Sequence, residues 1–196
     1  MTRLSVIATA ALVLLGCSGS KAEAPEKYRV NMETSRGLVV IEVTRADAPR
    51  GADRFYDLVK AKYFDGARFF RVVPGFVVQF GLAADPALSK KFDVPIQDDP
   101  VKQTNARGAL VFAATQQPNS RTEQLFINLA DNARLDQIGF APFGKVLSGM
   151  EFVDQITSEY GEQPDQGAIT AQGNAYIEKA FPKLDFIKTA TLAPAQ

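Results

Sequence analysis

The sequence predicts a mainly β domain with helices, built as a closed eight-stranded β-barrel that two or three helices cap. Two observations predict this fold. Short apolar-rich runs are separated by turns that contain Gly and Pro along most of the chain, as in barrels built from many short strands. Only a few segments carry apolar residues at helical spacing. Closure would also remove the exposed strand edges that an open sheet has to protect.

The predicted elements follow one another from residue 28. Strands at 28–34 and 37–43 flank a Ser-Arg-Gly turn, which predicts a hairpin. A helix follows, because Pro49 suits a first turn and the next apolar residues recur on one face. The remaining strands are expected at 68–73, 76–81, 109–113, 124–129, 143–147 and 185–192. Short helices are expected at 150–156 and 175–181, and surface connections at 83–107 and 161–174.

The first sixteen residues have the features of an export signal. Arg3 gives a positive start, and the uncharged run Leu4–Leu15 is mostly apolar. This run has twelve residues, whereas a membrane-spanning helix needs about 20. The sequence therefore predicts a signal peptide at 1–16 and no transmembrane helix there.

The apolar run ends in Leu-Leu-Gly-Cys, which resembles a bacterial lipobox with Cys17 as the lipid attachment site. The alternative is an incidental small residue beside a cleavage site. Residues 17–27 are then a lipidated polar tether, and 28–196 form one domain. We expect an extracytoplasmic, periplasmic protein held on a membrane by its lipid. Ser18, which is not acidic, favours the outer membrane.

The composition excludes several kinds of chemistry. The chain has no His, which rules out a Ser-His-Asp triad, a Cys-His pair and a His-ligated zinc site. Its single Cys lies in the leader, so the domain has no thiol chemistry and no disulfide. Equal numbers of basic and acidic residues, 22 of each, give no sign of nucleic-acid binding. The pair Asp98-Asp99 could hold a hard cation, but an exposed acidic turn is the better interpretation, so no metal or cofactor is expected.

Three motifs resemble, in order, those of the cyclophilins. The first is FFRVVPGFVVQ at 69–79, the second runs from Pro118-Asn119-Ser120 to QLFI at 124–127, and the third covers 134–136 and 140–146. The resemblance extends over roughly 28–192. It implies the cyclophilin barrel and peptidyl-prolyl cis-trans isomerase activity on proline-containing polypeptides.

The resemblance makes Arg71 and Gln79 the catalytic residues. Rotation about a peptide bond has a barrier of ~18–20 kcal/mol, because the nitrogen shares its lone pair with the carbonyl. In the twisted transition state this lone pair lies on the prolyl nitrogen, where a hydrogen-bonding cation stabilises it more than either planar state. Arg71 stays charged and presents a fixed fork of donors. Gln79 would orient Arg71 and contact the client backbone.

The remaining family positions form the surface that holds the proline. Their side chains are mostly apolar, which suits burial of a pyrrolidine ring. Val77 and Gln79 share one face of a strand, whereas Val78 and Phe80 point into the barrel. The chain departs from the family at Arg134, where a Trp is common, and at its pocket His, which is a Phe here. The implied substrate-binding residues are Phe76, Val77, Ala114, Thr115, Phe126, Leu135 and Phe140.

Two functions remain open at this point. The first is a monomeric isomerase that acts on exported proteins as they fold, a step that is slow without help. The second is a non-catalytic proline-binding module or a membrane-tethered holdase chaperone. Both take proline-containing polypeptides as partners. The added segment 160–182 is expected to pack its helix on the barrel, and docking of another protein is the alternative.

Overall fold

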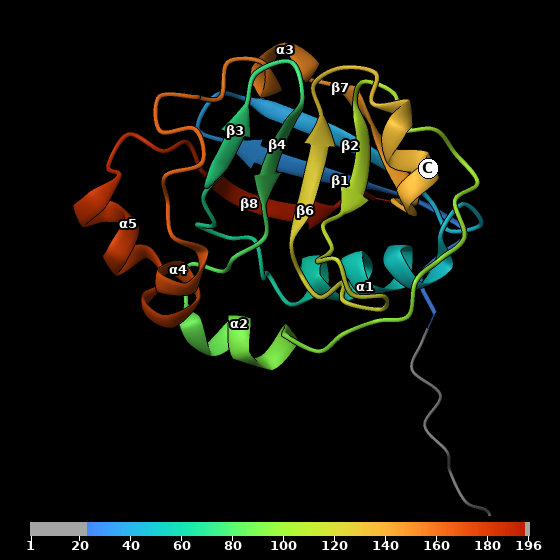
Figure 1. The fold of residues 1–196 in the computed structure, drawn as a ribbon, viewed down its shortest axis with the longest axis horizontal. Helices are drawn as coiled ribbons and strands as arrows, with labels where there is room; N and C mark the ends of the chain where they lie inside the picture. Colours follow the sequence, from blue (N-terminus) through green and yellow to red (C-terminus); the bar gives the residue numbers. More distant parts are fainter. Residues whose placement is uncertain (1–22, 195–196) are drawn as a thin grey trace, which may run out of the picture.

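One antiparallel sheet of eight strands dominates the structure, a computed structural model that describes residues 23–194. The predicted signal peptide and Cys17 lie outside the described residues. The strand order is β3-β4-β6-β5-β7-β2-β1-β8. In Figure 1, β3, β4 and β6 run upright in front and β1, β2 and β8 cross behind them, so the sheet curls back on itself. The strands are β1 (Lys27–Thr34), β2 (Leu38–Thr44), β3 (Arg71–Val73), β4 (Val77–Phe80), β5 (Ala109–Phe112), β6 (Leu125–Asn128), β7 (Pro142–Ser148) and β8 (Ile187–Leu192).

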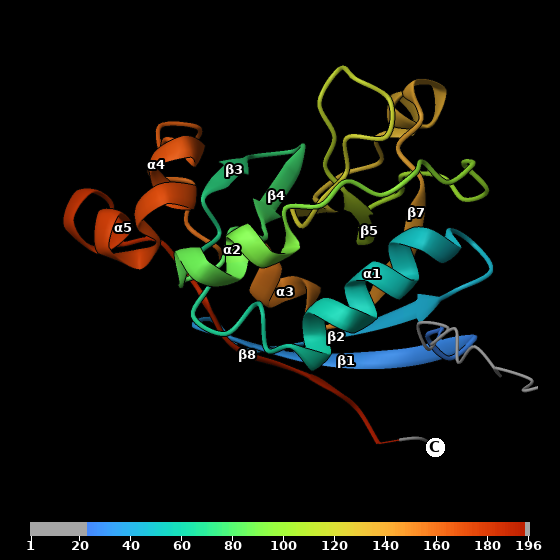
Figure 2. The same ribbon diagram turned by 90° about the horizontal axis from the view of Figure 1, so that it is seen from below.

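Five α-helices and one 3-10 helix accompany the sheet within residues 23–194. Helix α1 lies across the lower end of the curled sheet, and α2 lies below it (Figures 1 and 2). No helix in this range has the length and apolar character needed to cross a bilayer. The helices are α1 (Pro49–Lys60), α2 (Pro86–Phe92), the 3-10 helix η1 (Ala133–Ile138), α3 (Met150–Val153), α4 (Gln166–Gln172) and α5 (Asn174–Ala180).

The mainly β fold with helices is confirmed, but the predicted closure of the barrel is wrong. The sheet is an open, curled half-barrel whose edges are β3 and β8. The segments that precede these two strands are joined by an isolated bridge between Arg68 and Phe186 and by a few backbone hydrogen bonds, such as that from the Phe69 N–H to the carbonyl of Asp185. The free edge of β3 is used elsewhere, because the Val72 N–H donates to the carbonyl of Gly161, 3.1 Å away. The loop that contains Gly161 therefore pairs with part of the free edge of β3.

The two predicted surface connections contain helices that the sequence prediction missed. Helix α2 lies in 83–107, and its N-cap Asp85 accepts a hydrogen bond from the Ala87 N–H. Helix α4 lies in 161–174, and its N-cap Asp165 accepts from the Ala168 N–H. Both caps are recognisable signals. Each helix has only seven residues, too few for a clear apolar periodicity.

The interior of the curl is the main hydrophobic core. Alternate strand residues point inward, so Val78 and Phe80 of β4 join this core while Val77 joins a separate cluster. Aromatic rings fill the space between α1 and the sheet. Phe55 of α1 lies 5.5 Å from Phe143 of β7, measured between ring centroids. The predicted alternation of β4 is confirmed.

The acidic turn at Asp98-Asp99 is not simply exposed. Asp99 is buried and accepts hydrogen bonds from the backbone N–H groups of Arg50 and Gly51, at 3.3 and 2.9 Å. Helix α1 has no side-chain cap at its own N-cap residue, Ala48. Asp99 therefore caps α1 from a distant part of the chain, where a carboxylate is favoured by the helix dipole.

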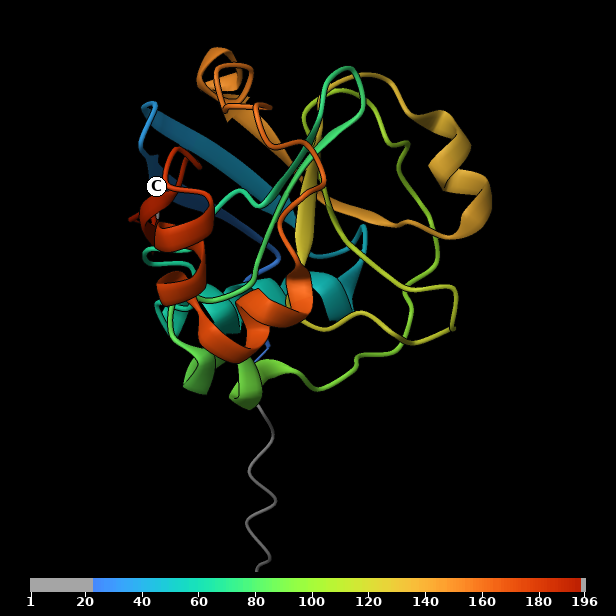
Figure 3. The same cartoon turned by 60° about the vertical axis from the view of Figure 1, so that its left-hand side comes forward.

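Helices α4 and α5 pack against the flank of the sheet beside β3, as predicted for the added segment. They lie together next to α2 (Figure 3). Ile169 of α4 and Ile177 of α5 share a cluster with Phe70 and Leu82, which lie next to β3 and β4. Gly173 joins the two helices at φ +60°, where a Cβ would lie 2.2 Å from the carbonyl oxygen of Ala84. Only glycine fits this close turn.

Candidate active site

A row of four residues crosses neighbouring strands on the outer face of the curl. Arg71 of β3 pairs with Gln79 of β4, Gln79 pairs with Phe126 of β6, and Phe126 pairs with Val111 of β5. Residues directly opposite each other in a sheet point to the same face. The register therefore places the cation, the amide and an apolar wall side by side.

Arg71 is held by two side chains. Its Nη1 donates to Oε1 of Gln79 at 3.2 Å, and its Nε donates to Oε1 of Glu162 at 2.5 Å. Gln79 is buried and donates in turn to Oε1 of Gln124 at 2.8 Å. No hydrogen bond among residues 23–194 uses Nη2 of Arg71. Two of the donor nitrogens of the guanidinium, Nε and Nη1, are thus held by the protein, and Nη2 can still donate to a ligand.

An apolar cluster lies beside this polar row. Val77, Phe126 and Leu135 are buried, and Phe76 and Phe140 are partly buried against them. The rings of Phe126 and Phe140 meet edge to face at 5.7 Å. The structure therefore brings together the five apolar residues that the sequence assigns to proline binding.

Ala114 and Thr115 lie with Arg71 and Gln79 in one groove of about 590 Å³. Ala114 is half-buried and Thr115 is exposed. The Thr115 N–H donates to Oγ of Ser120 at 3.0 Å, which fixes the loop that carries both residues. Four of the predicted site residues thus line this groove, and the pairing of Gln79 with Phe126 places the apolar cluster next to it.

Four polar residues that sequence reasoning missed support this surface from behind. Buried Asn128 and Asn132 are joined by a 2.8 Å hydrogen bond, and Asn132 also donates to the carbonyl of Phe76. Asn105 donates to Asp136 and to the carbonyl of Phe140, at 2.7 and 2.8 Å. These bonds hold η1 and the Phe140 segment in place. The sequence signal that could have found one of them is Asn128, a polar residue directly after the apolar strand residues of the second motif.

Asp136 illustrates the electrostatics of this support. Desolvation alone would raise the pKa of its carboxyl. Hydrogen bonds from the side chains of Asn105 and Thr104 and from the Asn105 backbone outweigh that effect and lower the pKa below its ordinary value. The carboxylate therefore stays charged and keeps its bonds at neutral pH.

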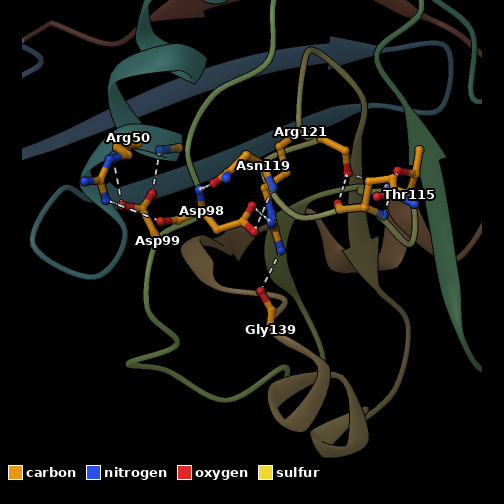
Figure 4. A network of polar contacts seen from close by, with 10 residues as sticks. Arg50, Asp98, Asp99, Thr115, Asn119, Arg121 and Gly139 are labelled. Carbon is orange, nitrogen blue, oxygen red and sulfur yellow. Dashed lines mark hydrogen bonds and ion pairs between the residues drawn. The ribbon is translucent and has the colours of Figure 1, made fainter.

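Arg121 braces three loops at the other end of the site (Figure 4). It forms an ion pair with Asp98 and donates to the carbonyl of Gly139 at 2.6 Å. Its guanidinium lies 5.6 Å from the ring centroid of Phe140. Arg134 similarly lies 4.9 Å from the ring of Phe76. Cations thus pack against both partly buried aromatic rings of the pocket.

The described residues show no cluster that could hold a metal ion: no group of three or more acidic side chains lies together within 23–194. Asp98 and Asp99 are engaged with Arg121 and the start of α1 instead. The site therefore consists of the hydrogen-bonding cation of Arg71 beside the apolar cluster around Phe126.

Comparison with known families agrees with this geometry. Residues 29–178 match the family described as cyclophilin type peptidyl-prolyl cis-trans isomerase/CLD. The chain belongs to this family. A peptidyl-prolyl cis-trans isomerase of Acinetobacter baylyi is 37% identical over 158 residues, which are 76% of this chain and 84% of that protein. The resemblance inferred from the three sequence motifs is confirmed.

Solved cyclophilin structures show the same fold. A cyclophilin type isomerase of Cryptosporidium parvum superposes with a TM-score of 0.66 at 20% identity, covering 87% of this chain and 99% of that one. A second structure of that protein, in the presence of the dipeptide Ala-Pro, gives a TM-score of 0.64 at 21% identity, covering 85% and 99%. At this identity the likeness concerns the cyclophilin fold alone.

Proposed function

We propose that this cyclophilin is an active peptidyl-prolyl isomerase of exported proteins, with Arg71 as its catalytic residue and Gln79 as the residue that orients it. The observation that carries the proposal is the row of Arg71, Gln79 and Phe126 across three paired strands. It places a fixed cation next to an apolar surface. A pure binding module needs only the apolar surface.

The geometry supports separate roles for the apolar residues, the loop residues and Arg71. The cluster of Phe126, Leu135 and Phe140 buries the proline ring, and each buried methylene contributes ~0.8 kcal/mol. Ala114 and Thr115 bind the backbone before the proline. Arg71 then donates a hydrogen bond to the prolyl nitrogen as the bond twists. The Cryptosporidium parvum protein, studied with Ala-Pro, supports proline-containing polypeptides as the ligand class.

The test is an isomerisation assay on an Ala-Pro-containing peptide with the wild type, Arg71→Ala and Arg71→Lys. Removal of one donor aimed at the transition state typically lowers the rate by about 10²–10³-fold. We expect that loss for Arg71→Ala, and partial retention for Arg71→Lys, which keeps the charge without the fork. Arg107→Ala is a matched control, because Arg107 pairs with Asp154 away from the groove. Undiminished catalysis in Arg71→Ala would falsify the assigned mechanism, and an inactive wild type that still binds the peptide would favour the binding module or holdase.

We also propose that the protein is a monomer held by a lipid on Cys17 in the periplasm, on the outer membrane. The support is the lipobox-like end of the leader in a chain with a single Cys. Labelling of cells with a lipid precursor should mark the wild type and leave Cys17→Ala unmarked. Membrane fractionation then locates the protein, and sedimentation of the domain gives its oligomeric state. Equal labelling of both chains would contradict the anchor.

A further inference from the structure

The segment Ser158–Gln163 reaches the catalytic edge of the sheet from the added C-terminal part of the chain. It lies against Val72, Val73 and Pro74 of the β3 hairpin. From it, Glu162 contacts Nε of Arg71 at 2.5 Å across 91 positions of sequence. Nothing in the three sequence motifs assigns this residue a role.

The position of this segment relative to Arg71 is fixed on both sides. On one side, the Val72 N–H donates to the carbonyl of Gly161 at 3.1 Å. On the other, Tyr160 packs against the cluster that contains Phe70 and meets the ring of Phe181 edge to face at 5.1 Å. The residues on either side of Arg71, Phe70 and Val72, are therefore linked to Tyr160 and Gly161, which precede Glu162.

The segment is also internally ordered. The Gly161 N–H donates to the carbonyl of Ser158 at 3.0 Å, and the Gln163 N–H donates to the carbonyl of Tyr160 at 2.9 Å. Two overlapping turns thus present Glu162 to the sheet. The Glu162 side chain itself is 61% exposed and that of Arg71 is 25% exposed. An ion pair so exposed stabilises the fold little, so its effect lies in where it holds the guanidinium.

We propose that Glu162 is a positioning residue for the isomerisation, which acts by holding Nε of Arg71. The inference rests on the proposed function of Arg71. Glu162 takes Nε and Gln79 takes one hydrogen of Nη1, which leaves the Nη2 edge for the client. With both anchors the long side chain points one way. With Gln79 alone it rotates about a single hydrogen bond and loses alignment with the prolyl nitrogen.

The Glu162 carboxylate also has an effect that would slow the reaction, because its negative charge partly offsets the positive charge with which Arg71 stabilises the transition state. In a solvated pair this attenuation is small, since water screens the charge of Glu162. Alignment is sensitive, because misplacement by about 1 Å costs up to about 100-fold in rate. Positioning therefore outweighs attenuation, and the sign of the predicted effect follows: loss of Glu162 slows the reaction.

The test compares Glu162→Ala and Glu162→Gln with the matched control Glu159→Ala. Glu159 lies in the same segment and pairs with exposed Lys183, away from Arg71. We expect kcat/KM to fall about three- to fivefold in Glu162→Ala, mainly through kcat, because an exposed ion pair contributes little and Gln79 still holds Nη1. Glu162→Gln keeps an acceptor oxygen and should retain most of the activity. Glu159→Ala should match the wild type.

A second measurement separates positioning from folding and from the proposed function. The Nε–H signal of Arg71 in a nitrogen-15 NMR spectrum is assigned by its loss in Arg71→Ala. It should shift in Glu162→Ala and stay in place in Glu159→Ala. An unmoved signal, a kcat/KM within twofold of wild type in Glu162→Ala, or a faster reaction in both Glu162 variants would overturn the proposal. An inactive wild type would overturn the proposed function, while the signal would still decide whether Glu162 holds Arg71.

Discussion

Replacement of Arg121 by Ala tests how the pocket wall is supported. The Arg121 side chain is only 9% exposed and connects Asp98 with the carbonyl of Gly139 (Figure 4). Its guanidinium also packs against the ring of Phe140. Truncation removes all three contacts at once. We expect the variant to fold, with lower stability and a looser Phe140.

The magnitude follows from the contacts. A hydrogen bond from a charged donor to the part-buried carbonyl of Gly139 contributes about 1.5–3 kcal/mol, and the cation–π contact with Phe140 contributes at least about 0.5–1 kcal/mol. The pair with Asp98 adds little, because Asp98 is 35% exposed and still accepts from the Asn119 N–H at 3.0 Å. A loss of about 2–4 kcal/mol lowers the Tm of a domain of this size by about 4–16 °C.

The assay combines thermal unfolding with isomerisation of an Ala-Pro peptide at a temperature where both proteins are folded. Because Phe140 packs edge to face on Phe126, its release should raise KM and reduce kcat/KM about fivefold, with kcat less affected. Arg50→Ala is the matched control. Arg50 also loses contacts with the Asp98–Asp99 turn, but its side chain is 48% exposed and lies away from Gly139 (Figure 4). An Arg121→Ala enzyme with the KM and Tm of Arg50→Ala would refute the reasoning.

Two further predictions concern buried carboxyl groups. Asp99→Ala removes the cap of α1 and should lower the free energy of unfolding by about 2 kcal/mol, seen as a Tm lower by about 4–8 °C; an unchanged Tm would contradict the capping role. Burial raises the pKa of the Glu123 carboxyl, whose Oε2 has no partner among the described residues. A raised folded pKa means that stability falls as pH rises above the unfolded pKa of about 4.3, so Glu123→Gln should be more stable than wild type at pH 7 and equal to it near pH 4. Thermal unfolding between pH 4 and 8 measures this, and a variant less stable at pH 7 would contradict it.

Much of the site was predictable because it lies within short stretches of regular strand. The motif at 69–79 spans β3, its turn and β4, so the pairing of Arg71 with Gln79 follows from hairpin register. The outward side of Val77 and Gln79 follows from the two-residue period of a strand. The helices at 86–92 and 166–172 were missed although their Asp caps are visible, because seven residues give no clear periodicity.

The contacts that complete the site join segments far apart in the chain, and no local pattern encodes them. Asp99 caps α1 across 48 positions, and Glu162 reaches Arg71 across 91. Closure of the barrel was wrongly expected for the same reason. The edge of β3 is taken by the carbonyl of Gly161, a partner that only the packing of the added segment brings there.

The sequence by itself determined the family, the strand order along the chain and the identity of the cation and the apolar wall. These depend on local geometry, in which side-chain direction follows from position along a strand. Tertiary structure alone decided that the sheet stays open, that Arg71 has a second anchor and that Arg121 braces the pocket. Each of these depends on contacts between segments that are distant in sequence, and such contacts are decided by how the whole core packs.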